Sequence, residues 1–263
     1  MNDRDFLQLQ SRTEDLLRDC VRRCMPRFFG YLSPEDARSV GRLAASAGDV
    51  FVLSFGVFPD AERVIVGFFP SDVYLSPSQG GDADAYREMA DTALIRVDGS
   101  GYASLDHRSL LGSLMALGIT RESVGDIRVL DDAKTAFVAT TAAMADYIAL
   151  SLERVGKDAV KVKKVSENEA VSALQRYEDR VVSLASLRLD AFVSAVCGVS
   201  RENAKKLIAA GKVSVDHSEV TACDRNLSEK NIISVRGYGK FLLDGWLGTS
   251  AKGRERIVVR KYV

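Results

Sequence analysis

Five cations in the segment Ser186–Asp216 are placed where they could bind phosphate groups. They are Arg188, Arg201, Lys205, Lys206 and Lys212. The segment, SLRLDAFVSAVCGVSRENAKKLIAAGKVSVD, is typical of two short helices followed by a strand, and its cations fall at the ends and turns of these elements. An arginine beside a helix start favours an anion twice, because the helix end offers N–H groups and the guanidinium can bind two oxygens. The pattern predicts a compact phosphate-binding surface, and ordinary solvated charges explain it equally well.

The apolar residues of this segment define the helices that must position those cations. Leu189, Phe192, Val193 and Val196 share one helix face that has to be buried. Ser200 is the predicted N-cap of a second helix, Arg201–Ala210, which Gly211 ends. Strands are predicted at KVSVD, NIISV and KFLLDGWL, and the glycine turn RGYG between the last two carries Arg236, with Lys240 just after it.

Composition restricts the class of protein. The 263 residues are 46% hydrophobic and 27% charged, which is ordinary for a globular protein. The formal net charge is zero, but residues 182–263 hold 14 Lys and Arg against 8 Asp and Glu, whereas residues 1–181 hold 22 against 28. A basic module therefore accompanies an acidic body. No apolar run reaches the eighteen or so residues of a membrane span, and the polar start resembles no targeting peptide, so we expect a cytoplasmic protein.

The cysteines and histidines give little support for a metal site. Cys20 and Cys24 lie four residues apart on a predicted helix, where two thiolates could share a face. A zinc site would need two more ligands, and the chain has only the isolated His107 and His217. We therefore expect reduced thiols, no metal and no cofactor.

The rest of the chain predicts an α+β multidomain protein. A helix over Asp5–Phe29, a second helix begun by Ser33 and Pro34, and a hairpin from VFVLSFGVF and RVIVGFFP predict an N-terminal α+β domain over residues 1–75. SPSQGGDADA is predicted to be a boundary loop. Six segments then follow in the order βαββαβ: TALIRVDG, HRSLLGSLMALG, GDIRVLD, TAFVATT, MADYIALSLERVG and AVKVKKV. They predict an RRM-like α/β sandwich as a middle domain over residues 76–165, although its strands lack the aromatic residues with which RRM domains stack bases.

The C-terminal residues resemble the S4 RNA-binding domain, which has an αL-type fold. The resemblance rests on RLDAFVS, SRENAKKLIAAGKVSVD and VRGYGKF, from residue 188 to about residue 241. It implies an S4 domain with a C-terminal extension over residues 182–263, after a linker over residues 166–181. It also implies RNA contacts by Arg188, Ser200, Arg201, Lys205, Lys206, Lys212, Arg236 and Lys240. Lys240 replaces the commoner arginine of the glycine turn, which keeps the charge but loses the bidentate fork.

Further motifs resemble the YlmH family of S4-domain proteins. They are DHRSLLGSLMALGITRESVGDIRV (Asp106–Val129), YLSPEDA, RVIVGFFP and GTSAKGRERIVVRKYV. Ser109 departs from the pattern, which has an acid there. The resemblance implies a non-enzymatic protein that binds structured rRNA, with tRNA beside it, on the large ribosomal subunit and acts in ribosome-associated quality control of stalled translation. We expect RNA and the large subunit as partners, no membrane, and a monomer.

Two other classes of function are an RNA-modifying enzyme and a protein-interaction scaffold. S4-linked pseudouridine synthases, which modify rRNA or tRNA, carry a catalytic aspartate in an RLD motif, but here the RLD containing Asp190 begins the S4 helix itself. We therefore assign no catalytic residue. A protein-interaction scaffold would dock a partner on the helix Phe6–Phe29, a pattern that is more often a core face. Lys157, Lys161 and Lys163 could extend an RNA surface or form a solvated strand face, and the sequence leaves both open.

Overall fold

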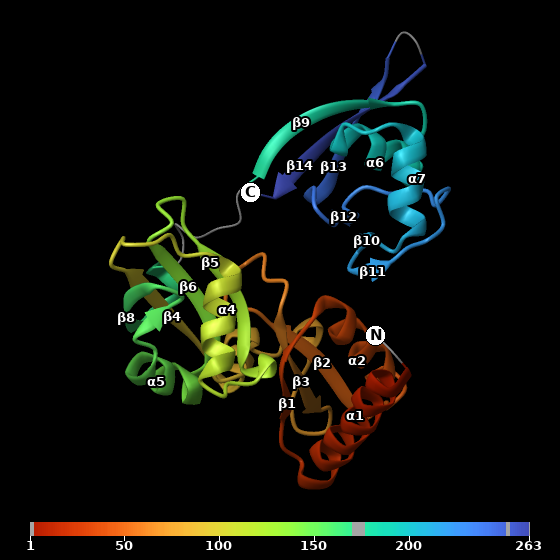
Figure 1. Ribbon diagram of the computed structural model, residues 1–263. Coiled ribbons are helices and arrows are strands. Elements are labelled where there is room, and N and C mark those ends of the chain that lie inside the picture. The colour runs from red at the N-terminus through yellow and green to blue at the C-terminus, as the bar shows by residue number, and fades with distance from the viewer. Residues whose placement is uncertain (1–2, 170–176, 251–252, 263) are drawn as a thin grey trace. The chain divides into compact units, whose positions relative to one another are not determined.

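The computed structural model describes residues 3–169, 177–250 and 253–262, and the chain forms two compact units, Met1–Leu174 and Gln175–Val263. The first unit contains, in chain order, α1 (Asp3–Arg23), β1 (Arg27–Leu32), α2 (Pro34–Ala44), β2 (Val50–Phe55), β3 (Val64–Pro70), the 3₁₀ turn η1 (Pro77–Gln79), α3 (Ala83–Met89), β4 (Thr92–Gly99), α4 (His107–Ala116), η2 (Arg121–Ser123), β5 (Val124–Val129), β6 (Thr135–Thr141), α5 (Ala142–Ser151), β7 (Arg154–Val155) and β8 (Asp158–Val165) (Figure 1).

The first helix is shorter than the sequence predicted. We expected a helix from Asp5 to Phe29, but α1 ends at Arg23 and β1 begins at Arg27. Pro26 lacks the N–H that another helical turn would need. The two following phenylalanines then face opposite sides of the strand, since Phe29 packs with Phe68 and Phe28 packs with Phe69. Apolar residues buried on both faces of a strand were thus mistaken for a helical stripe.

The hairpin and its covering helix were predicted correctly. Ser33 is the N-cap of α2 and its hydroxyl accepts from the Asp36 N–H at 3.2 Å. Strands β2 and β3 pair antiparallel, and β1 pairs with the other edge of β3, which gives the order β1-β3-β2. This N-terminal sheet packs against α1 and α2 on one face. The segment Ser76–Ala85 is more ordered than the predicted loop, because it contains η1 and the start of α3, which Asp82 caps.

The middle of the chain has the predicted RRM-like fold. Strands β4, β5, β6 and β8 form an antiparallel sheet in the order β5-β6-β4-β8, and the short β7 extends it beyond β8. Helices α4 and α5 cover one face through Leu110, Leu114 and Ile148, which pack on Ile95 and Val97. The helix predicted over MADYIALSLERVG was too long, because α5 ends at Ser151.

The other face of this middle sheet is covered by the N-terminal sheet. Leu94, Phe137 and Ala139 on that face share a core with Tyr31 and Phe69. Phe137 is only 2% exposed. In an RRM this is the face on which aromatic side chains stack RNA bases. Here the face is largely filled by the protein itself, so the middle fold does not offer that surface.

The second unit has a six-stranded sheet with two helices on one face. Its elements are β9 (Tyr177–Leu184), α6 (Leu189–Cys197), α7 (Arg201–Ala209), β10 (Val213–Val215), β11 (Ser218–Glu219), β12 (Ile232–Val235), β13 (Gly239–Thr249) and β14 (Glu255–Tyr262). The strand order is β11-β10-β12-β13-β14-β9. Phe192 and Ile208 of the helices pack on Val213, Phe241 and Ile257 of the sheet.

Strand β9 differs from the sequence prediction. We expected a linker over residues 166–181, but β9 starts at Tyr177 and pairs along its length with β14. Residues 170–176 of that predicted linker lie outside the described residues. The charged, sparsely apolar pattern arose because most of β9 is exposed, including four consecutive residues from Glu178 to Val181. The fold is α+β, with an S4 fold at the C-terminus, and the division into three domains at residues 75, 165 and 181 stays a prediction.

Candidate RNA-binding site

The two arginines predicted to contact RNA meet at one buried carboxylate. Asp190, in the first turn of α6, is completely buried. Arg201 donates through Nε and Nη2 to its two oxygens, both at 3.1 Å. Arg188 donates through Nε at 3.3 Å and Nη2 at 3.5 Å. The ion pairs therefore bring the starts of α6 and α7 together.

The electrostatics of this cluster leave a positive surface. Burial opposes ionisation of Asp190, but hydrogen bonds from Arg201 and Arg188 outweigh it and hold the pKa of the carboxyl below its usual value. One negative charge faces two positive ones. The side chains of Arg188 and Arg201 remain 37% and 50% exposed, and Nη1 of each lies outside these ion pairs. The outer part of each guanidinium can therefore bind a phosphate oxygen.

The start of α6 does not offer its N–H groups to an anion, contrary to the argument from sequence. The Leu189 N–H donates to the Arg225 carbonyl at 2.9 Å, and the Asp190 N–H donates to the Cys223 carbonyl at 3.1 Å. The loop after β11 therefore satisfies this helix end. At the start of α7 the Ser200 hydroxyl accepts from the Asn203 N–H at 3.2 Å, as its predicted N-cap role requires. At the start of α6, phosphate binding would therefore depend on the guanidinium group of Arg188.

Lys205 and Lys206 point in different directions although they are neighbours. Ala204 and Ile208 form the buried stripe of α7. Lys205 lies one turn after Arg201 beside that stripe, whereas Lys206 lies roughly opposite it, given about 100° per residue. Lys206 also forms an exposed ion pair with Glu202 at 2.9 Å. Of these two lysines, only Lys205 continues the surface that begins at Arg201.

Lys212 and Arg236 form a second pair of cations, beyond the other end of α7. The Arg236 N–H donates to the Lys212 carbonyl at 2.9 Å, because Lys212 precedes β10 and Arg236 follows β12, the strand paired with it. Both side chains are exposed, as is that of Lys205. Among the described residues these three side chains make no ion pair. A strip of cations thus follows α7 from its start to its end, about 14 Å for nine residues.

Lys240 is separated from this strip by the sheet. Its neighbour Phe241 is buried under the helices, so Lys240 points to the opposite face. There its Nζ lies 4.9 Å from the centre of the Tyr262 ring. Of the eight predicted RNA contacts, the structure places Arg188, Ser200, Arg201 and Lys205 at the starts of the two helices and along one side of α7. It places Lys212 and Arg236 together beyond the end of α7, and it sets Lys206 and Lys240 apart.

The sequence argument missed what Asp190 does. It noted the residue only as a misleading match to a catalytic aspartate, whereas the structure makes it the partner of both arginines. A buried, doubly paired carboxylate is not open to a substrate. The signal was available in the RLD and SR motifs, whose charges are eleven residues apart at the starts of consecutive helices.

The YlmH-like segment Asp106–Val129 has a structural role in the first unit. Glu122 accepts two hydrogen bonds from Arg12 of α1, at 2.6 and 2.7 Å. Asp126 accepts from the backbone N–H groups of Glu62 and Arg63. Arg63 in turn donates to the carbonyls of Tyr31, Arg121 and Val124. These bonds join the N-terminal sheet to the middle sheet.

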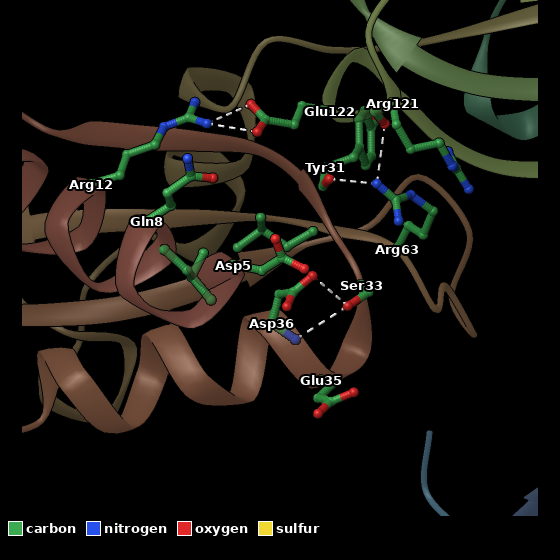
Figure 2. A pocket seen from close by; sticks show the side chains of 12 residues that line it. Asp5, Gln8, Arg12, Tyr31, Ser33, Glu35, Asp36, Arg63, Arg121 and Glu122 are labelled. Atoms are coloured by element: carbon green, nitrogen blue, oxygen red, sulfur yellow. Dashed lines mark hydrogen bonds and ion pairs between the residues drawn. The ribbon is translucent and has the colours of Figure 1, made fainter. Parts of the chain in front are cut away.

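A polar pocket of about 690 Å³ lies at this joint. Figure 2 shows Arg12 directed at Glu122 and Arg63 directed at the carbonyls of Tyr31 and Arg121. Burial, and then repulsion by Arg63, lowers the pKa of Arg121 to about 10. The pocket holds acids and arginines together, and Arg12 and Arg63 are already engaged with the protein. It therefore favours no particular ligand.

Metal chemistry finds no support in the parts of the chain that the structure describes. There, no three His, Cys, Asp or Glu side chains gather as they would around a metal ion. All four cysteines are unpaired thiols. Cys20 is buried and its thiol donates to the Phe68 carbonyl at 3.4 Å, and burial raises its pKa. Across residues 3–169, 177–250 and 253–262, no helix is both long enough and apolar enough to span a membrane.

Comparisons with known proteins agree with this architecture. Residues 187–227, which include the Arg188–Asp190–Arg201 cluster, match the S4 domain family, and residues 91–169 match the family described as "Putative RNA-binding domain in YlmH". A relative from Bacillus subtilis (strain 168), "Ribosome-associated protein quality control protein P2", is 29% identical over 233 residues, which cover 88% of this chain and 85% of that protein. The solved structure "Cell division protein ylmH from Streptococcus pneumoniae" has the same fold over 64% of this chain and 93% of its own, with a TM-score of 0.51 and 19% identity.

The match over residues 187–227 shows an S4 domain, an RNA-binding module, at the C-terminus. Because residues 91–169 also match the RNA-binding domain of YlmH, the chain is similar to the YlmH family of S4-domain proteins.

Proposed function

We propose that this protein binds structured rRNA on the large ribosomal subunit, with tRNA beside it, and acts in ribosome-associated quality control of stalled translation. The observation that carries the proposal is the cluster of Arg188 and Arg201 on buried Asp190, extended along α7 by Lys205, Lys212 and Arg236. Such a strip can follow a sugar-phosphate backbone, because each cation neutralises one phosphate. The name of the Bacillus subtilis relative, a ribosome-associated protein quality control protein, supports the proposed role in quality control.

The proposed role is binding without catalysis, by a monomer in the cytoplasm. The families that match are RNA-binding domains, which supports a role that ends with binding. The rival pseudouridine synthase would need an accessible aspartate, and Asp190 is 0% exposed. Its carboxylate oxygens also accept from two arginines. The rival scaffold function has no comparable observation in its favour.

The test is co-sedimentation of the tagged protein with ribosomal particles from cell lysate on a sucrose gradient, followed by sequencing of crosslinked RNA. The test variant is Lys205→Ala/Lys212→Ala/Arg236→Ala, which removes three exposed cations that hold no ion pair. The matched control is Arg180→Ala/Lys206→Ala/Lys230→Ala, which removes the same charge from side chains paired with Glu178, Glu202 and Asp244.

We expect the wild type and the control to travel with large subunits and the test variant to stay at the top of the gradient. Crosslinks of the wild type would then identify the rRNA element. If the wild type itself stays at the top with no enriched rRNA, the proposal fails. If both triple variants lose co-sedimentation equally, the interaction depends on net charge alone and the site is not on α7.

A further inference from the structure

An exposed tyrosine lies on an ordered loop of the RRM-like fold. Tyr102 follows β4 and is 81% exposed, the second highest value among the large apolar and aromatic side chains that the structure leaves exposed. A tyrosine ring so exposed stabilises no core. Exposure alone is ordinary for a single aromatic side chain, so the surroundings of the ring decide whether it can bind a ligand.

A buried carboxylate accepts hydrogen bonds from the loop that carries Tyr102. Asp158, at the start of β8, has no exposed surface. It accepts hydrogen bonds from the Ser100 hydroxyl and from the backbone N–H groups of Gly101 and Tyr102, the last two at 3.3 and 3.2 Å. Three bonds to consecutive residues hold the backbone in place. The ring of Tyr102 is therefore presented from a rigid base.

The pairing of β7 with β8 places Arg154 and Lys157 in the same hollow as Tyr102. The Ser100 N–H donates to the Ala159 carbonyl at 2.9 Å, and Ala159 is paired with Arg154 across β7 and β8. Ser100, Tyr102, Arg154, Lys157 and Ala159 line a hollow of about 490 Å³. Arg154 donates to the Lys157 carbonyl at 2.8 Å, which links the two cations. None of the five lining residues is acidic.

A third cation borders the loop. The end of the Lys134 side chain passes so close to Gly101 that a Cβ built there would lie 3.3 Å from its Nζ. Lys134 comes from the turn between β5 and β6 and is exposed. The loop thus combines one exposed aromatic ring with three cations from two segments, the β7–β8 hairpin and the turn between β5 and β6.

We propose that this loop is a binding site for unpaired nucleotides of RNA, with one base stacked on Tyr102 and the neighbouring phosphates held by Arg154, Lys157 and Lys134. Aromatic stacking beside a positive groove is how single-stranded nucleic acid is bound without sequence readout. The usual RRM surface is filled by Phe137 and Leu94 against the N-terminal sheet, so the site lies at the end of the middle sheet. The inference relies on the proposed function only for the class of ligand.

The first test locates the contacts. The full-length protein is irradiated with a 4-thiouridine-containing oligouridine, and the nucleotide adducts are mapped on peptides by mass spectrometry. An adduct on the peptide that contains Tyr102 supports the site. Adducts confined to peptides of α6 and α7 would overturn it while leaving the proposed function intact. A protein without adducts would overturn the site, while the proposed function, which concerns structured rRNA, is decided by the sedimentation experiment.

The second test measures the ring and the hollow separately, with a fluorescein-labelled oligouridine as probe. Tyr102→Ala is expected to weaken binding about 5- to 150-fold, the range for loss of one stacked base, whereas Tyr102→Phe keeps the ring and should bind like the wild type. Ala159→Glu, at an exposed strand position, puts a negative charge into the hollow and should weaken binding while leaving Tyr102 in place. Equal binding by Tyr102→Ala and Tyr102→Phe would overturn the proposal.

Discussion

Arg201 forms a bidentate ion pair with Asp190, eleven residues earlier in the chain, with both N···O distances at 3.1 Å. The pair crosses from the start of α7 to the start of α6. It satisfies a carboxylate that has no exposed surface, and it fixes a guanidinium that is half exposed. One interaction thus stabilises the helix pair and orients the cation proposed to meet RNA.

Replacing Asp190 tests the structural half of this relationship. Asp190→Asn leaves two arginines without their counter-ion, and we expect the free energy of unfolding of the second unit to fall by about 2–3 kcal/mol, less than for a fully buried pair because both arginines reach solvent. Urea unfolding followed by Trp246 fluorescence reports this unit, since Trp246 lies in β13 and is the single tryptophan of the chain.

Asp224→Asn is the control for that experiment, because Asp224 is an exposed acid of the same unit. Its effect should stay within about 0.5 kcal/mol. Equal unfolding midpoints for the two variants would mean that the ion pairs contribute no stability.

The depressed pKa of Asp190 makes the stability of the second unit depend on pH. Because the folded pKa of Asp190 is depressed, its contribution is fully present above the unfolded value of about 3.9 and is lost as the pH falls through the folded pKa. The stability difference between wild type and Asp190→Asn should therefore be constant from neutral pH to about pH 5 and narrow below about pH 4. Urea titrations at a series of pH values measure it. A difference that stays unchanged into strong acid would show that charge is not its source.

Local features of this fold were predictable, and contacts between distant residues were not. Ser33 and Ser200 were identified as caps because a cap depends on the next three residues. The role of Asp190 depends on how two helices pack, which no single helix pattern contains. The run AFVA in β6 did hold a usable signal, because consecutive apolar residues are typical of a strand covered on both faces. The structure buries β6 at six of its seven positions. That signal would have predicted the covering of Phe137.

The neighbouring lysines of α7 test the position of the candidate RNA site. Lys205→Ala should weaken binding to purified large subunits and lower the slope of log K against log salt by about 0.7 to 1, the value of one phosphate contact. Lys206→Ala removes the same charge from the next position, where the side chain is paired with Glu202. It should leave the slope unchanged. If Lys206→Ala lowers the slope as much as Lys205→Ala, the RNA surface includes the outer side of α7.

The joint between the two sheets of the first unit depends on close backbone approach. At Gly30 of β1 a Cβ would lie 2.9 Å from the Cβ of Glu122 and closer still to its carbonyl oxygen. Gly30→Ala must therefore push β1 away from η2 and strain the Arg12–Glu122 ion pair. We expect the free energy of unfolding of this unit to fall by about 1–3 kcal/mol.

Gly112 of α4 offers a matched control, because a Cβ there meets nothing within 4 Å. Gly112→Ala should stabilise the helix by up to about 1 kcal/mol, opposite in sign to Gly30→Ala. Far-ultraviolet circular dichroism during urea unfolding reports both units and Trp246 fluorescence reports the second, so the expected shift appears in the dichroism while the fluorescence transition stays unchanged. If both variants raise the free energy of unfolding, β1 does not press on η2.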